Sequence, residues 1–513
     1  MARFAQGAPT MLRSRFSNKT LRRVGLVILL AAPAWYMGKI TMAKFEIGGA
    51  SPNQRTLGAV AFVEQRGMEQ MCTGVTVTPQ STWLLGSYEG SRDVVPGDTH
   101  PVSIDALLHD KATTDANGDE PMGTRGTRER TTSFLSHLNA QGQFELVATV
   151  SGTTCLQTTP DGRTLYLLTS QDRPASASGD GIQQTAVFRS DDQGKTWTWQ
   201  RAGFMDTTNV SAWALKLSGF GAQELWSVGS GDGLAFDAEA PAAAGADNPA
   251  PDAGRAVALF YSSDSGKTAQ RVPVPQSMLV SVDHVRGKAP SGVEWGSGAE
   301  AVEGEVHAQV VQLDAQRAVL WVSQRFRYSR PDSAYYAGAM LVTSRAELRR
   351  VDGHWQVGAP QRLEDTWVDT VYRNPAGRVI GLIDHAGDKR TQVALLDTAT
   401  LAWNEQGSLP TSFDPLSASV YTRGFWAGQE TLVANVSGTH HVPKWIYPWS
   451  ADGAQISGDA VFYSRDWGRS WHRLAIPGYL GVAGFDAARD EVFWSKGNWY
   501  ESSDKRVYGY GLR

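Results

Sequence analysis

The chain has few cysteines, little net charge and a single long apolar run. Its low net charge excludes one class of protein. Its 513 residues include two cysteines and carry a formal net charge of -4. A chain with this charge lacks the basic surplus that a nucleic-acid-binding protein normally shows. Long segments with a helical repeat are absent as well, whereas glycine (53) and tryptophan (18) are abundant. The composition therefore predicts a globular β protein that binds no nucleic acid.

The one long apolar run lies at residues 24–43, directly after a basic segment. Residues 1–23 hold six arginines and lysines and no acidic residue. A basic flank before an apolar core is typical of an export signal whose basic end stays in the cytoplasm. The run matches the ~20 residues that a bilayer requires. We therefore expect a transmembrane signal anchor, with a cleaved signal peptide as the alternative.

This export signal sets the expected location and domain order. Residues 1–23 form a basic cytoplasmic segment, 24–43 the anchor or signal helix, 44–54 a linker and 55–513 the folded domain. We predict a single-pass protein of a bacterial inner membrane, bound through its residues 24–43, with the folded domain in the periplasm. If the signal is cleaved, the protein is secreted or periplasmic instead.

Few residues have a spacing that suits a covalent cross-link or a metal. In an exported protein Cys72 and Cys155 can form a disulfide, and two separate buried thiols are the open alternative. No second cysteine or histidine stands at ligand spacing from either one. Residues 115–120 resemble the start of a calcium loop, but Gly126 occupies the twelfth position, where such a loop needs glutamate. We therefore expect no metal and no other cofactor.

Three short stretches of the chain repeat the pattern S-x-D-x-G, each between two segments with the composition of strands. Glycine supplies the positive φ that a tight turn needs, and aspartate can accept hydrogen bonds from the N–H groups of the turn. The pattern therefore predicts the turn of a β-hairpin, and a structural rather than catalytic aspartate. The residues of the repeat are Ser190, Asp192, Gly194 and Trp197; Ser262, Asp264 and Gly266; and Ser464, Asp466, Gly468 and Trp471.

This repeat resembles the Asp box (BNR repeat) of sialidase-like β-propellers. The resemblance implies an all-β fold, a ring of four-stranded blades that removes free sheet edges by closure. Aligning the hairpins on the repeat gives seven blades, with six as the alternative. A strand at 58–63 is left over, and we expect it to close the ring against the last blade. A degenerate copy of the repeat at 502–506 is expected to join the last two strands.

Four long insertions all fall between the second and third strands of predicted blades. They lie at 88–128, 229–254, 325–338 and 437–458. Because strand direction alternates within a blade, these insertions share one side of the ring, opposite to the Asp-box turns. We call this side the strand 2–3 face, and we predict that it is the functional surface, since long loops in a compact domain are usually functional or disordered.

Two of these insertions are rich in arginine, histidine and aromatic residues. Arginine with aromatic side chains is typical of the anchors of protein interfaces, and equally of sites that stack sugars or bind anions. The two adjacent histidines point in opposite directions in an extended chain, so we do not expect them to share a metal. The candidate binding residues are Arg325, Arg327, Tyr328, Arg330, His440, His441, Trp445, Tyr447 and Trp449.

The resemblance alone does not select an activity. Sialidases clamp a carboxylate with three arginines from different blades and use a tyrosine nucleophile, and their Arg-Ile-Pro sequence is absent from this chain. We therefore assign no catalytic residue and do not expect an enzyme. The expected function is that of a membrane-tethered propeller that binds a protein partner, as an envelope-assembly factor or a toxin-immunity protein. A sialidase-like glycoside hydrolase is the alternative.

Overall fold

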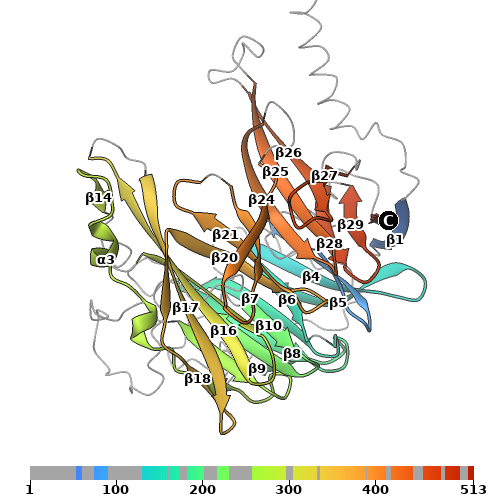
Figure 1. Cartoon of the computed structure of the whole chain (residues 1–513). Helices are drawn as coiled ribbons and strands as arrows, with labels where there is room; N and C mark the ends of the chain where they lie inside the picture. The colour runs from blue at the N-terminus through green and yellow to red at the C-terminus, as the bar shows by residue number, and fades with distance from the viewer. Residues whose placement is uncertain are drawn as a thin grey trace, which may run out of the picture.

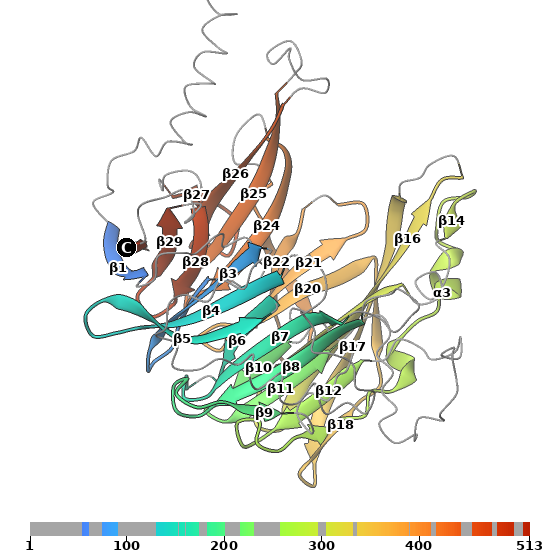
Figure 2. The same ribbon diagram turned by 180° about the vertical axis from the view of Figure 1, so that it is seen from behind.

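The computed structural model describes most of the chain from residue 54 onward, and its described residues form an all-β protein, as predicted. The described ranges are 54–60, 74–90, 130–151, 153–159, 161–173, 182–200, 216–229, 257–295, 304–331, 336–388, 390–411, 417–442, 454–474, 480–496 and 506–512. Figures 1 and 2 show small antiparallel sheets arranged in a propeller-like ring, seen from opposite sides.

Five of the sheets among the described residues have four or six strands each, and they follow one another along the chain. In the four-stranded sheets, each strand pairs with the next strand in sequence. The first two sheets are β6 (Thr153–Thr158), β7 (Leu165–Arg173), β8 (Ile182–Ser190) and β9 (Thr198–Gln200), and then β10 (Lys216–Phe220), β11 (Glu224–Gly229), β12 (Ala258–Ser262) and β13 (Gln270–Arg271). The third, six-stranded sheet contains β14 (Glu294–Trp295), β15 (Glu305–Gln312), β16 (Arg317–Ser329), β17 (Tyr336–Val351), β18 (His354–Val357) and β19 (Gln361–Glu364). The last two sheets are β20 (Thr366–Arg373), β21 (Val379–His385), β22 (Gln392–Leu396) and β23 (Trp403–Ser408), and then β24 (Ser417–Ala427), β25 (Leu432–Val442), β26 (Ala454–Ser464) and β27 (His472–Arg473).

The remaining sheet has eight strands and joins the two ends of the folded domain. Its order is β2-β3-β4-β5-β1-β30-β29-β28. Strand β1 pairs antiparallel with β30 and, at Ala59 and Val60, parallel with β5. The first strands of the two halves, β2 and β28, also lie side by side. The strands are β1 (Gln54–Val60), β2 (Gly74–Val77), β3 (Thr82–Gly90), β4 (Arg130–Leu138), β5 (Gln143–Ser151), β28 (Leu480–Asp486), β29 (Glu491–Lys496) and β30 (Arg506–Gly511).

Strand β1 therefore performs the closure that the sequence predicts for residues 58–63, although it begins four residues earlier, at Gln54. The expected turn at 502–506 falls between β29 and β30, and all of it except Arg506 lies outside the described residues. Strand β30 pairs with β29 on one side and with β1 on the other. It is thus the third strand of its unit, and the N-terminal β1 supplies the fourth.

The apolar core lies between neighbouring sheets. Trp83 of β3 packs with Leu167 and Phe188 of the next sheet, and Val393 of β22 packs with Leu432 of the sheet that follows. Full burial of such a side chain contributes about 1.5–3 kcal/mol, so each sheet depends on its neighbour for stability. Second strands supply four of the five fully buried tryptophans of the described chain, Trp83, Trp226, Trp321 and Trp494; the fifth, Trp355, lies in β18.

The three repeated turns connect β8 to β9, β12 to β13 and β26 to β27, and they share one hydrogen-bonding pattern. In the first, Ser190 Oγ donates to Asp192 Oδ1 (2.8 Å) and accepts from the Gly194 N–H (2.8 Å). The Thr196 N–H donates to Asp192 Oδ1 at 2.9 Å, and Gln193 and Gly194 have φ of 60° and 80°. The same bonds recur among Ser262, Asp264, Gly266 and Thr268, and among Ser464, Asp466, Gly468 and Ser470.

Each turn also contacts the preceding sheet. The indole N–H of Trp471 donates to the Ser408 carbonyl at 2.7 Å, and the hydroxyl of Tyr166 donates to the Ser265 carbonyl. A Cβ added to Gly407 would lie 2.2 Å from the carbonyl carbon of Gly468. The turns therefore hold neighbouring sheets together, which fits the structural role predicted for their aspartates.

Helical structure among the described residues is limited to η1 (Gln276–Met278) and α3 (Val282–Arg286). No helix in this part of the chain has both the length and the apolar character needed to cross a bilayer, and the predicted anchor at 24–43 lies outside it. Cys155 is buried, at 5% exposure, and disulfide-bonded. The other cysteine of the sequence, Cys72, lies outside the described residues, so its pairing with Cys155 stays a prediction.

Replacing Gly407 by alanine should destabilise the fold. The new methyl group would overlap backbone atoms of Gly468, which cannot move without disturbing the turn. We expect the free energy of unfolding to fall by about 3 kcal/mol, measured as a lower urea midpoint at constant slope. Gly287→Ala is the matched control, because Gly287 has φ of -69° and open space around its Cβ position. Equal midpoints for the two variants would contradict the proposed contact.

Replacing Asp466 by alanine should destabilise the protein in a pH-dependent way. The hydrogen bond from the Ser470 hydroxyl, together with the Ser470 N–H, lowers the pKa of Asp466 from 3.8 to about 2. The stability that ionised Asp466 supplies is therefore present above pH 3.8 and is lost as the pH falls toward 2. We expect a cost of ~1 kcal/mol near neutral pH, since water partly satisfies the exposed turn. Urea unfolding at several pH values should show wild type and Asp466→Ala converging in acid.

Candidate functional site

The structure places the predicted arginines in a strand rather than in a loop. Arg325, Arg327 and Tyr328 belong to β16, where Arg325 pairs with Leu341 and Tyr328 with Gly338 of β17. The β16–β17 connection does join second and third strands, but the hairpin continues several residues beyond the predicted start of the insertion. Arg330 is exposed and directly follows β16.

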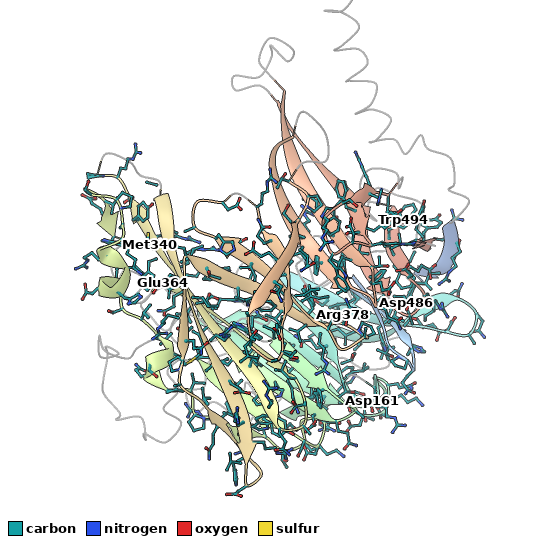
Figure 3. The ribbon with its side chains drawn as sticks, viewed as in Figure 1. Asp161, Met340, Glu364, Arg378, Asp486 and Trp494 are labelled. Carbon is teal, nitrogen blue, oxygen red and sulfur yellow. The ribbon has the colours of Figure 1, made fainter. Side chains whose placement is uncertain are left out.

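The second predicted loop is also partly strand. His440 and His441 lie in β25, where they pair with Ile456 and Gln455 of β26. Trp445, Tyr447 and Trp449 lie outside the described residues, as do residues 115–120. In both views, the far ends of the β16–β17 and β25–β26 hairpins extend toward the same side of the ring (Figures 1 and 2). In Figure 3, Met340 and Glu364 lie across the molecule from Asp161, which lies in a turn between first and second strands.

A group of charged and aromatic side chains gathers where β15 and β20 lie side by side. These are the first strands of neighbouring sheets, and they contact each other. The group includes members of β16 and β21 as well, and we call it the β15–β20 cluster. Its members are Glu305, His307, Gln309, Arg325, Arg327, Trp367, Asp369 and Asp384.

The arginines of the cluster converge on Glu305. Arg327 Nη2 lies 2.9 Å and Arg325 Nη1 lies 3.6 Å from Glu305 Oε2. Glu305 is the direct cross-strand partner of Arg325. The guanidinium carbon of Arg325 also lies 4.3 Å from the ring centroid of Trp367 in the next sheet. A cation over an aromatic face is attracted by the ring quadrupole, so Trp367 holds Arg325 in place independently of Glu305.

Asp369 occupies a β-bulge. The register between β20 and β21 shifts between Val368 and Thr370, which leaves Asp369 out of the ladder. Its carbonyl oxygen instead accepts hydrogen bonds from His307 Nε2 (2.7 Å) and Gln309 Nε2 (3.2 Å) of β15. Bulges commonly re-aim a side chain next to a functional site. Here the bulge joins two sheets through the backbone and leaves the Asp369 side chain exposed.

Asp384, near the end of β21, is a titratable group of the cluster whose pKa is raised above its usual value. Burial raises the pKa of its carboxyl, and the charge of Asp369 raises it further. A 2.6 Å hydrogen bond from Thr391 Oγ1 and the charge of Arg325 oppose this effect without cancelling it. Two neighbouring carboxyls with different environments are the usual basis for separate acid and base roles.

Sequence reasoning found the arginines of this cluster but not its carboxylates. Glu305, His307, Asp369 and Asp384 come from three strands that meet only when two sheets pack side by side, and no local motif marks them. The one local signal that could have found them is the alternation of polar and apolar residues at the start of a first strand, as in Glu305-Val306-His307.

Other parts of the described chain show fewer features of a binding or catalytic site. No group of three His, Cys, Asp or Glu side chains within the described ranges is placed to hold a metal ion. A cavity of about 300 Å³ lies at the turns on the side opposite the strand 2–3 face, lined by residues that include Glu430, Arg465 and Asp490. Arg465 and Asp490 pair with each other at 3.5 Å. Asp384, the carboxyl whose pKa is raised, is not among the residues that line this cavity. We place the candidate site at the β15–β20 cluster.

Comparisons with known proteins found similar solved structures but no family. No family model and no curated protein matches the chain. One similar solved structure is a PL25 ulvan lyase (9% identity, 89% of this chain, 95% of that chain, TM-score 0.43). Another is an oligogalacturonate lyase in complex with manganese (10% identity, 75% of this chain, 86% of that chain, TM-score 0.34). A third is the GH74 xyloglucanase of Xanthomonas campestris (13% identity, 88% of this chain, 55% of that chain, TM-score 0.38). All three are named as enzymes that act on carbohydrates, but likeness at this level carries no argument about the fold or the chemistry of this chain.

The protonation of Asp384 should respond to its two charged neighbours in opposite directions. Asp369→Asn removes a negative charge, so it should lower the pKa of Asp384, whereas Arg325→Gln removes a positive charge and should raise it. Carbon-13 NMR titration of protein labelled at aspartate carboxyls measures both changes. A pKa of Asp384 that does not move in either variant would show that the three side chains are not neighbours in solution.

Proposed function

We propose that the protein is a seven-bladed β-propeller with Asp-box turns. Five small sheets and the two halves of the eight-stranded sheet, β2–β5 and β28–β30 with β1, make seven units of this kind. The hydrogen bonds shared by the three S-x-D-x-G turns support the Asp-box assignment. The export signal predicted at 24–43 motivates the proposal of a periplasmic domain tethered to the inner membrane.

We further propose that the protein cleaves glycosidic bonds at the β15–β20 cluster. The observation that carries this proposal is the placement of Asp369 and Asp384, one exposed and one partly buried, beside Arg325 at a junction of two sheets. Glycoside cleavage commonly needs one carboxyl that keeps its proton and a second that stays charged. Asp384, whose pKa is raised, suits the role of general acid toward the leaving oxygen, and Asp369 suits that of the charged partner.

This proposal differs from the chemistry of sialidases. A sialidase needs arginines from three blades and a tyrosine nucleophile, and the sequence lacks its Arg-Ile-Pro motif. Arg325 and Arg327 lie on one strand of one sheet. The proposed reaction therefore depends on a pair of carboxyls and not on a tyrosine, and the substrate is a carbohydrate outside the sialosides.

Binding of a protein partner is the second candidate function. It is favoured by the β16–β17 and β25–β26 hairpins, which extend toward one side of the ring and carry the arginines and histidines predicted as anchors. Under this proposal the partner docks on the strand 2–3 face through Arg327, Tyr328 and Arg330. An envelope-assembly factor or an immunity protein would act in this way beside the inner membrane.

Turnover by an Asp384→Asn variant tests the main proposal. The full chain is incubated with a panel of plant, algal and bacterial polysaccharides and with a sialoside, and new reducing ends are measured. Loss of a general acid should lower the rate by roughly 10²–10⁴-fold, without a change in melting temperature. Asp388→Asn is the control, because Asp388 is an exposed carboxylate in the turn after the same strand.

Two outcomes would contradict glycoside cleavage at this site. One is full activity of Asp384→Asn. The other is a wild-type protein that cleaves no polysaccharide of the panel while it captures a protein from an envelope extract, with capture lost in Arg327→Ala. The second outcome would support the partner-binding candidate instead.

A further inference from the structure

Glu305 holds two arginines while remaining largely open to solvent. Its side chain is 46% exposed, and one of its oxygens, Oε2, lies within 4 Å of both Arg325 and Arg327. Exposed ion pairs contribute little to stability, because water competes for both partners. Glu305 therefore gains little from this contact and can leave it at small cost.

The same sheet contains a second carboxylate between two arginines, and the contrast is informative. Glu347 accepts from Arg317 Nε at 2.6 Å and from Arg349 Nη2 at 3.0 Å. Its side chain is 23% exposed, and Arg317 also donates to the Thr398 carbonyl of the next sheet at 2.9 Å. The hydrogen bond from Arg317 lowers the pKa of Glu347. This group is a structural clamp between sheets, and both of its arginine contacts are short.

Arg325 does not depend on Glu305 in this way. Its 3.6 Å approach to Glu305 is longer than a hydrogen bond, whereas its guanidinium is stacked on Trp367, which is 3% exposed and fixed in the core. If Glu305 swings away, Trp367 keeps the guanidinium in position. The planar group then presents its donors to another anion, and guanidinium matches the geometry of a carboxylate or an oxyanion such as sulfate.

We propose that Arg325 and Arg327 bind a carboxylate or sulfate group of an anionic carbohydrate, and that Glu305 occupies this position in the free protein as an internal competitor. The inference rests on the proposed function, because it assigns the substrate class of the same site. Asp384 lies close enough to Arg325 for their charges to interact, so the bound anion would lie beside the proposed general acid. A uronic acid or a sulfated sugar next to the scissile bond fits this arrangement.

Isothermal titration calorimetry of the full chain tests the proposal. The probes are tetragalacturonate, its fully methyl-esterified and therefore neutral form, and inorganic sulfate. All variants carry Asp384→Asn, so that a probe is not consumed. When an internal competitor is removed, the Kd of the probe is multiplied by the fraction of molecules whose site was free of the competitor beforehand, so binding tightens. We expect Glu305→Gln to bind tetragalacturonate several-fold tighter, and Arg325→Gln to bind it roughly tenfold weaker or worse.

Glu347→Gln is the matched control and should leave the affinity unchanged, because its arginines serve a clamp elsewhere in the sheet. Tight binding of sulfate with weak binding of tetragalacturonate would assign a sulfated ligand, whereas the reverse would assign a uronate; either result supports the anion site. Equal affinity for the neutral ester, or a Glu305→Gln variant that binds no tighter than its parent, would overturn the proposal. If the protein cleaves neutral glycans and no anionic ones, this inference is wrong, whereas the proposed function of glycoside cleavage still holds.

Discussion

Closure of the ring by β1 is the contact on which the rest of the structure depends. Each sheet packs its apolar faces against its neighbours, so an open ring would expose one such face on each side of the gap. Strand β1 fills the gap by pairing with β30 and with β5 at once, and Arg55 of β1 pairs with Glu491 of β29. Since all sheet junctions belong to one ring, closure at this junction also limits the angle between β15 and β20.

The geometry of the candidate site depends on that angle, because its side chains come from both of the sheets that meet at this junction. Hydroxyl and backbone groups hold the two sheets together beneath the charged side chains. The Val368 N–H donates to Ser323 Oγ at 3.0 Å, and Thr343 Oγ1 donates to the Thr366 carbonyl at 2.8 Å. These bonds are buried, where an unsatisfied group costs ~1–3 kcal/mol. The junction is therefore firmly held, and the charged groups above it need not supply its stability.

The sequence indicated the scaffold far better than the site, for a physical reason. Hairpin turns and strand periodicity are local, so the turns at Asp192, Asp264 and Asp466 and the closing strand near residue 58 could be predicted. The extent of the β16–β17 hairpin could not, because Phe326 and Val342 pack on α3, which is itself an insertion. A site made at a sheet junction leaves no local pattern, and only its arginines, which stand close together in sequence, attracted notice.

The bulge at Asp369 shows how one residue can serve both scaffold and site. A bulged residue has backbone groups outside its own ladder, and the Asp369 carbonyl uses this freedom to accept from His307 and Gln309 of the neighbouring sheet. The inter-sheet bond is thus made by the main chain, which every residue type carries. The Asp369 side chain takes no part in these bonds between the sheets. Asparagine or alanine at position 369 should therefore preserve the junction, and an effect of such a change on Asp384 or on turnover would report the carboxylate itself.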